Sequence, residues 1–212
     1  MVSQRHNEIG AGPGESPGEA GVPRAANAIP EESLLDAAYD LLLAVGMRRM
    51  SMADIARRAG ISRASLYRRW PHVRAVVAAL VTREFSALAA QAPDVGGTGR
   101  EAVVSAVTHL VTTLRMHPLV RKIVEVDPEF LVPYLLHRTG ATADAQLAMI
   151  EDGLRRGRRD GSVRAGEPAM LARSVLLTAW SFTLTGPVLV PEDSYDALDQ
   201  ELTLLLERYL RP

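Results

Sequence analysis

Residues 61–71 read ISRASLYRRWP, and this stretch decides the fold because it joins a helix cap, apolar anchors and three arginines with no acidic residue. Ser62 is typical of a helix N-cap, and Pro71 ends the helix that follows. Ile61 and Leu66 are the apolar positions expected to hold this helix against its neighbour. The pattern predicts a short basic helix with an outward-facing polar side.

A second short helix is expected immediately before this segment. Ser51 is a good N-cap with Asp54 three residues later, as in a capping box, and Gly60 ends the helix in a tight turn. A longer helix is expected from Glu31, with leucines at helical spacing, and it stops at Gly46. Two short capped helices joined by a glycine-containing turn form a helix-turn-helix, whose second helix enters the DNA major groove.

The charge distribution supports a nucleic-acid partner. Net charge is −1 for the 212 residues, yet residues 46–74 carry eight arginines against Asp54 alone, a net of +7. A compact basic segment in a mildly acidic protein is typical of a surface that binds a polyanion. We therefore expect double-stranded DNA to be the partner of this segment.

The stretch LLDAAYDLLLAVGMRRMSMADIARRAGISRASLYRRWPHVRAVVAAL resembles the DNA-binding domain of TetR-family transcriptional regulators. The resemblance covers about residues 33–80 and is carried by the IAxxAGxS core and the SLYRxW recognition helix. It implies a homodimer on a palindromic operator, usually acting as a repressor. It also implies a helical C-terminal domain that binds a small ligand and forms the dimer.

The side chains left outside the expected apolar contacts are candidates for DNA contact. Arginine reads guanine through two hydrogen bonds, hydroxyls donate to phosphates, and alanine permits close approach. The family commonly has a lysine where this chain has Val73, and His72 or Arg74 is the expected substitute; Trp70 stands where phenylalanine is common and is expected in the core. The candidates are Ser51, Ser62, Arg63, Ala64, Ser65, Tyr67, Arg68, His72 and Arg74.

Domain organisation follows from composition. The Gly- and Pro-rich residues 1–30 predict a disordered tail, residues 31–80 the helix-turn-helix domain, and residues 81–212 a helical ligand-binding and dimerisation domain. No alternating strand pattern is present, so the fold is expected to be all-α. After a linker at 93–99, helices are expected near 100–116, 119–126, 129–137, 143–159, 168–185 and 194–210.

The last two expected helices are candidates for the dimer interface. The helix over 168–185 is apolar on most faces, which predicts that a partner covers one side of it. The alternative is a monomeric core. The interface candidates are Leu171, Val175, Leu198, Leu202, Leu205, Leu206 and Tyr209.

A ligand pocket is expected among the middle helices. Its candidate wall is apolar and aromatic, which favours a lipophilic ligand such as a fatty acid, although each residue could equally be ordinary core. The candidates are His109, Leu110, Leu114, Ile123, Phe130, Tyr134, His137, Met149, Leu177, Thr178, Trp180 and Phe182.

Several classes of function are not expected. The chain has no cysteine, its five histidines form no zinc-binding pattern, and no nucleophile–base constellation or phosphate loop is present, so we expect neither an enzyme nor a cofactor. No signal peptide or membrane-length apolar run is evident, so we expect a cytoplasmic protein without a membrane partner. The competing hypotheses are an architectural DNA-binding protein without a ligand and, less favoured, a helical lipid-binding enzyme.

Overall fold

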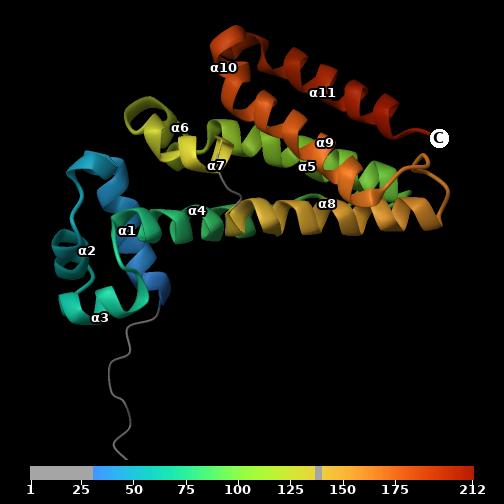
Figure 1. The fold of residues 1–212 in the computed structure, drawn as a ribbon. Coiled ribbons are helices and arrows are strands. Elements are labelled where there is room, and N and C mark those ends of the chain that lie inside the picture. The colour runs from blue at the N-terminus through green and yellow to red at the C-terminus, as the bar shows by residue number, and fades with distance from the viewer. Residues whose placement is uncertain (1–30, 137–139) are drawn as a thin grey trace, which may run out of the picture.

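The computed structural model describes residues 31–136 and 140–212, which form helices and no strand, in two lobes (Figure 1). The predicted tail at 1–30 lies outside the described residues. The α-helices are α1 (Glu31–Val45), α2 (Met52–Arg58), α3 (Arg63–Arg69), α4 (Val73–Ala89), α5 (Gly99–Met116), α6 (Pro118–Val126), α7 (Val132–Leu136), α8 (Ala141–Arg159), α9 (Pro168–Trp180), α10 (Gly186–Leu189) and α11 (Tyr195–Leu210). Shorter turns are the 3-10 helices η1 (Met47–Arg49), η2 (Pro128–Phe130) and η4 (Glu192–Ser194), and the π-helical turn η3 (Ser181–Thr185).

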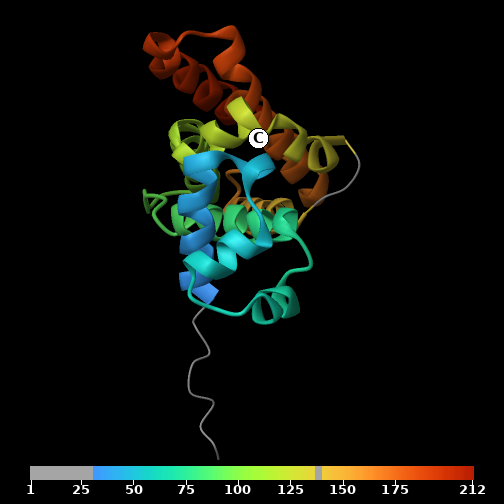
Figure 2. The same ribbon diagram turned by 90° about the vertical axis from the view of Figure 1, so that its left-hand side faces the viewer.

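The smaller lobe consists of α1, α2, α3 and the first half of α4, and Figure 2 views it from its own side. Its core forms because the apolar positions of α1 recur at helical spacing and turn inward, as Leu34 and Leu42 do. Leu66 of α3 and Leu80 of α4 are fully buried in the same core. Helix α4 then continues into the larger lobe, so it is shared by both.

The larger lobe is built on α5, α8, α9 and α11, whose valines and leucines form a second core. The backbones of α5 and α8 lie in direct contact at Gly99 and Gly157. Only glycine fits at Gly99, because a Cβ there would overlap the backbone of Gly157. Helices α9, α10 and α11 lie along the outer edge of this lobe (Figure 1). Of the helices in the described ranges, none has the length and apolarity needed to cross a bilayer.

Two expected helices differ from the prediction, and proline accounts for both. The helix expected over 129–137 is instead η2 followed by the short α7, because Pro133 lacks an N–H and its ring would clash with the carbonyl of Glu129. The helix expected over 168–185 keeps its α-geometry only to Trp180. It then widens into η3 and continues as α10, where the π-turn makes room for Pro187.

A buried carboxylate joins the two lobes. Asp127, at the end of α6, is fully buried, and its carboxylate accepts hydrogen bonds from the backbone N–H groups of Met47, at 2.6 Å, and Arg48, at 3.2 Å. These two groups begin η1, so Asp127 caps a helix that lies 80 residues earlier in the chain. Gly46 precedes η1 with φ of 76°, and a Cβ there would lie 3.1 Å from the Asp127 carboxylate. Glycine therefore suits this position twice over.

A second link between the lobes involves Arg74, one of the residues expected to contact DNA. The guanidinium of Arg74, in the first turn of α4, donates to the carbonyls of Glu129 and Phe130 at 3.2 and 3.3 Å. It also lies 5.5 Å from the centre of the Phe130 ring. Arg74 is thus engaged between the lobes, because the proline-interrupted segment at 128–133 leaves carbonyls free to accept from it.

Replacing Asp127 is expected to destabilise the protein strongly. In Asp127→Ala, two buried N–H groups lose their acceptor, and each unsatisfied group costs about 1–3 kcal/mol. We expect the free energy of unfolding, measured by urea titration, to fall by about 2–5 kcal/mol. Glu129→Ala is the matched control, because it removes only the exposed partner of Arg48, 2.6 Å away. Equal losses in the two variants would contradict the buried cap.

Candidate functional site

Helix α3 forms because its cap and its anchors act locally. The Ser62 hydroxyl accepts from the backbone N–H of Ser65 at 3.1 Å, and the Ile61 N–H donates to Ala56 of α2 at 2.9 Å. Leu66 is fully buried against the smaller lobe, so the opposite face of α3 is turned to solvent. The helix-turn-helix predicted from the sequence is therefore present in the structure.

The exposed face of α3 carries the predicted DNA-contacting side chains. Arg63, Ala64 and Arg68 are exposed, and Tyr67 keeps 52% of its surface accessible, unusual for a large aromatic residue without a partner. Arg68 donates to the Ser65 hydroxyl at 3.2 Å, and Ser65 lies 3.0 Å from the Ser62 hydroxyl. The face offers guanidinium and hydroxyl donors on one side of one helix, suited to base edges and phosphates.

Two further predicted contacts, Ser51 and His72, act as helix caps at the same surface. Ser51 accepts from the Asp54 N–H at 3.1 Å and caps α2, and the His72 Nδ1 accepts from the Ala75 N–H at 3.1 Å and caps α4. Hydrogen bonds from the Ser51 hydroxyl and then from Arg57 hold the pKa of the Asp54 carboxyl below its usual value. Both caps are exposed, so each helix start faces outward.

Only part of the basic segment is free to meet phosphate. Arg48, Arg57 and Arg58 form ion pairs with Glu129, Asp54 and Asp40 at 2.5–2.7 Å, and Arg74 holds backbone carbonyls. The charge count from the sequence therefore overstates the cation available to DNA. Within the described part of the chain, four arginines of 46–74 form neither an ion pair nor a hydrogen bond to a backbone carbonyl: Arg49, Arg63, Arg68 and Arg69.

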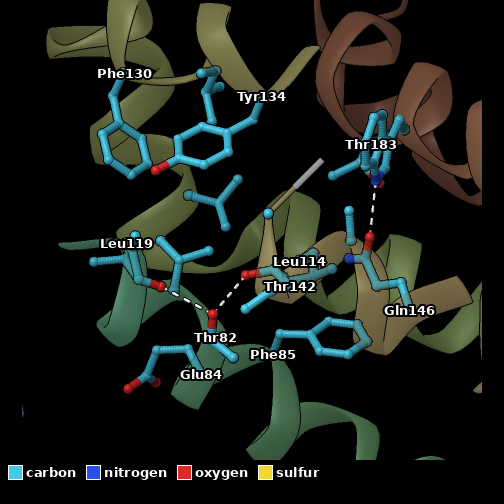
Figure 3. Close-up of a pocket in the computed structure, with 18 of the residues that line it drawn as sticks. Thr82, Glu84, Phe85, Leu114, Leu119, Phe130, Tyr134, Thr142, Gln146 and Thr183 are labelled. Atoms are coloured by element: carbon cyan, nitrogen blue, oxygen red, sulfur yellow. Dashed lines mark hydrogen bonds between the residues drawn. The ribbon is translucent and has the colours of Figure 1, made fainter. Parts of the chain in front are cut away.

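A cavity of about 390 Å³ lies where the two lobes meet. Helix α4 supplies one wall with Ala78 to Phe85, and the segment 130–135 supplies another (Figure 3). Four predicted residues line it: Leu114, Phe130, Tyr134 and Trp180. Two more, Leu110 and Met149, line an adjoining cavity of about 30 Å³. The main cavity falls within the ~300–1,000 Å³ of small-molecule sites.

The other predicted lining residues lie elsewhere. Ile123 is buried in the core of the smaller lobe because α6 packs on α1, and Leu177 faces outward with 65% of its surface exposed. Thr178 donates to the Ser174 carbonyl, and neither Phe182 nor His109 lines either of these two cavities. His137 lies outside the described residues.

The polar groups of the main cavity were not predicted from the sequence. Thr82 of α4 and Thr142 of α8 are joined by a hydrogen bond of 2.7 Å between their hydroxyls, and the Gln146 side-chain oxygen accepts from the Trp180 indole N–H at 3.0 Å (Figure 3). Thr183 also lines the wall, with its hydroxyl donating to the Ala179 carbonyl. Thr142 and Gln146 stand one helical turn apart on α8, a spacing that would have paired them had this helix been predicted to face a cavity.

Near Glu84, the ionisable groups around the cavity include more carboxylates than cations. Glu84 lines it, 2.6 Å from Arg83, which also contacts Asp36 at 2.7 Å and Glu32 at 3.3 Å. His117 Nε2 lies 3.6 Å from Glu84, but burial lowers the pKa of His117 despite the opposing effect of that carboxylate. His117 is therefore neutral at neutral pH, and Arg83 is the cation shared among these carboxylates.

The predicted dimer-interface residues divide into two groups. Leu171, Val175, Leu202 and Leu206 are buried inside the chain's own larger lobe, so they hold α9 and α11 together. Tyr209 and Leu198 are half-buried, and Leu205 is 44% exposed. Sequence periodicity locates an apolar face of a helix without indicating whether the chain itself or a partner covers it. The large exposed apolar side chains of this edge are Met170, Leu177, Val188, Leu189, Leu204 and Leu205.

Comparison with known proteins relates the chain to bacterial regulators. Residues 34–80 match the family described as "Bacterial regulatory proteins, tetR family". An HTH-type transcriptional regulator of Mycobacterium bovis is 33% identical over 177 residues, which are 84% of this chain and 92% of that protein. A regulator of Mycobacterium tuberculosis is 32% identical with the same coverage.

Solved structures share the fold. The transcriptional repressor QsdR of R. erythropolis has a TM-score of 0.64 at 17% identity, covering 86% of this chain and 96% of that one. The TetR family repressor AlkX of Dietzia has a TM-score of 0.64 at 20% identity, covering 87% and 97%. Together with the helix-turn-helix geometry and the two Mycobacterium relatives, these findings establish that the chain belongs to the TetR family of bacterial transcriptional regulators.

Proposed function

We propose that this regulator is a ligand-responsive repressor that binds a palindromic operator as a homodimer and is released by a hydrophobic small molecule. The observation that carries the proposal is the position of the cavity. Its wall includes Phe130, three residues from the carboxylate of Asp127 that holds η1. One segment thus touches both the ligand site and the DNA-binding lobe.

DNA binding is assigned to the exposed face of α3. Arg63 forms no ion pair within the described residues, and it stands in the first turn of the helix, the part that meets base edges in a helix-turn-helix. Arg68 and Tyr67 follow on the same face, with Ser65 oriented by its neighbours. Arg49 and Arg69 are assigned to phosphates, and Ser51 and His72 to the outward-facing helix starts.

Dimerisation is assigned to the edge formed by α9, α10 and α11. Leu177, Val188 and Leu189 are 65–78% exposed in the single chain, and they belong to adjacent helices. A cluster of large apolar side chains on one edge is typical of a protein interface. A homodimer about a two-fold axis covers this edge with its own copy.

Release is assigned to a change at the junction. A ligand shifts the equilibrium only through different affinities for two arrangements of the lobes. Filling the cavity moves Phe130, and with it the Glu129 and Phe130 carbonyls that hold Arg74 at the start of α4. The recognition helices then no longer match two successive half-sites, roughly 34–36 Å apart.

The ligand is proposed as apolar because the cavity wall is mostly alanine, leucine and aromatic residues. SmeT, a repressor of a multidrug efflux pump that shares the fold at 23–24% identity, was solved in complex with triclosan. That complex supports a small-molecule site in this fold. An architectural DNA-binding protein has no use for such a cavity, so we favour the ligand-responsive regulator.

Substitutions on α3 are expected to separate base reading from phosphate binding. After the operator is selected from genomic fragments, Arg63→Ala should weaken its binding by about 1–3 kcal/mol, or roughly 5- to 150-fold, with less effect on random DNA. Arg69→Ala should weaken both and lower the salt slope by about one. Fluorescence anisotropy at several salt concentrations measures both effects. Arg155→Ala, on α8, is the control, and an effect of Arg63→Ala no larger than the control would contradict the assignment.

Charge on the apolar edge is expected to break the dimer. Leu177→Glu places a carboxylate among the apolar side chains of the partner, where its burial is unfavourable. Sedimentation velocity at micromolar protein should then show a monomer where the unaltered chain is a dimer, and operator affinity should fall. Val95→Glu alters another exposed apolar residue, 50% accessible and away from this edge, and should remain dimeric. A dimeric Leu177→Glu protein would refute the assigned interface.

A further inference from the structure

Gln146 presents hydrogen-bond donors to the cavity. Its side chain is nine-tenths buried, and the Trp180 indole N–H, which can only donate, bonds to one end of its amide at 3.0 Å. The end of the amide that accepts from the indole must be the oxygen, so the other end is the NH₂ group. Figure 3 shows the nitrogen turned away from the Trp180 bond, to the side on which Thr142 lies. Within the described residues no acceptor is bonded to it.

The neighbouring hydroxyl has the opposite character. Thr82 donates its one hydroxyl hydrogen to the Ala78 carbonyl at 3.0 Å, so Thr142 must be the donor in the 2.7 Å bond between the two threonines. Thr142 then keeps only lone pairs for a ligand. Thr183 likewise keeps only lone pairs for a ligand, because its hydroxyl hydrogen is donated to the Ala179 carbonyl. Gln146 is thus the side chain whose donors are established as free at this wall.

We propose that the cavity selects an uncharged, largely apolar molecule with a carbonyl oxygen that accepts a hydrogen bond from the Gln146 amide. This assignment rests on the proposed function, in which the cavity is the inducer site. In this assignment Gln146 determines the ligand specificity, and the hydrogen bond from Trp180 orients its amide. Both residues line the main cavity and the smaller one beside it, so the carbonyl lies at their junction.

The charge around the cavity disfavours a free carboxylate, and with it the fatty acid expected from composition. Glu84 lines the same space, while Arg83 is already shared among Glu84, Asp36 and Glu32. His117 faces Glu84 and Tyr39, and burial lowers its pKa. No lysine, arginine or histidine lines the cavity within the described ranges. A carboxylate would lose its hydration there without gaining a cation.

A ligand without an acceptor is also disfavoured. If it fills the cavity, the two N–H groups of Gln146 are left without a partner, and a buried unsatisfied donor is unfavourable. Sites built to hydrogen-bond one ligand group reject analogues that lack the group more strongly than they reject a missing methylene. The expected order of affinity is therefore ketone above both hydrocarbon and carboxylate.

Isothermal titration calorimetry on the full chain tests this order with three probes: 2-decanone, decanoate and butylbenzene. We expect 2-decanone to bind at least roughly tenfold more tightly than decanoate, the effect of about one hydrogen bond. In Gln146→Leu the affinity for 2-decanone should fall by on the order of tenfold, while that for butylbenzene should not fall. Gln146→Glu keeps an acceptor for Trp180 and should lose the ketone preference as well.

Thr142→Val is the matched control, because it alters the other polar group on the same face of α8 and leaves the Gln146 donors in place; it should retain the ketone preference. Unfolding temperature and operator binding are measured for each variant to establish that it is folded. Decanoate binding as tightly as 2-decanone, a ketone preference that survives both Gln146 variants, or no binding of any probe would overturn the assignment.

Operator binding is measured in the same samples, which separates this inference from the function on which it rests. If the probe order holds and 2-decanone fails to release operator DNA, the carbonyl site stands and the release mechanism fails. If the unaltered chain binds no specific DNA while the probe order holds, the proposed repressor function fails and the ligand assignment stands.

Discussion

The hydrogen bonds from the Met47 and Arg48 N–H groups to the buried carboxylate of Asp127 are the constraint on which the arrangement of the two lobes depends. A side-chain acceptor at the start of a helix satisfies N–H donors that would otherwise lack a partner, and full burial makes leaving them unsatisfied unfavourable. Gly46 permits this contact because its backbone is left-handed and because a Cβ would crowd Asp127. Asp127, the residue that follows α6, thereby holds the smaller lobe at η1.

The cavity shares its wall with this junction. Phe130 lies between the ligand space and the guanidinium of Arg74, and α4 lines the cavity with its second half after beginning at the DNA-binding surface. A ligand that changes the segment 127–130 therefore acts on two starting points of the smaller lobe, η1 and α4. In the proposed mechanism this double attachment converts a local change of packing into a change in the spacing of the recognition helices.

The elements predicted well from the sequence are those with local causes. Serine caps, a glycine turn and the Leu66 anchor act within a few residues, so the exposed face of α3 was predicted residue by residue. Features that depend on contacts between distant parts of the chain were not predicted. The residues around Arg74 do not indicate that a carbonyl 55 residues later accepts a hydrogen bond from it. That carbonyl is free because Pro133 interrupts the helix expected over 129–137, an effect that the helical spacing of the sequence concealed.

The cavity shows the same limit. Phe130 and Trp180, which were expected in a ligand pocket because large apolar residues are common in pocket walls, lie in the wall of this cavity. Gln146 was missed because a single glutamine in a polar helix has no distinguishing pattern until Trp180 is placed beside it. Helices α9 and α11 are apolar on more than one face, so the sequence alone did not indicate which of their leucines the chain itself buries and which stay exposed.

The central claim, that filling the cavity changes the spacing of the recognition helices, is tested most directly by a distance measurement across the dimer. The chain has no cysteine, so Arg69→Cys places a single spin label on the exposed end of each α3. Double electron–electron resonance would be recorded with and without 2-decanone, at a concentration that calorimetry shows to saturate the cavity. The proposed release mechanism predicts a shifted distance distribution in the liganded protein. Identical distributions at saturation would contradict it.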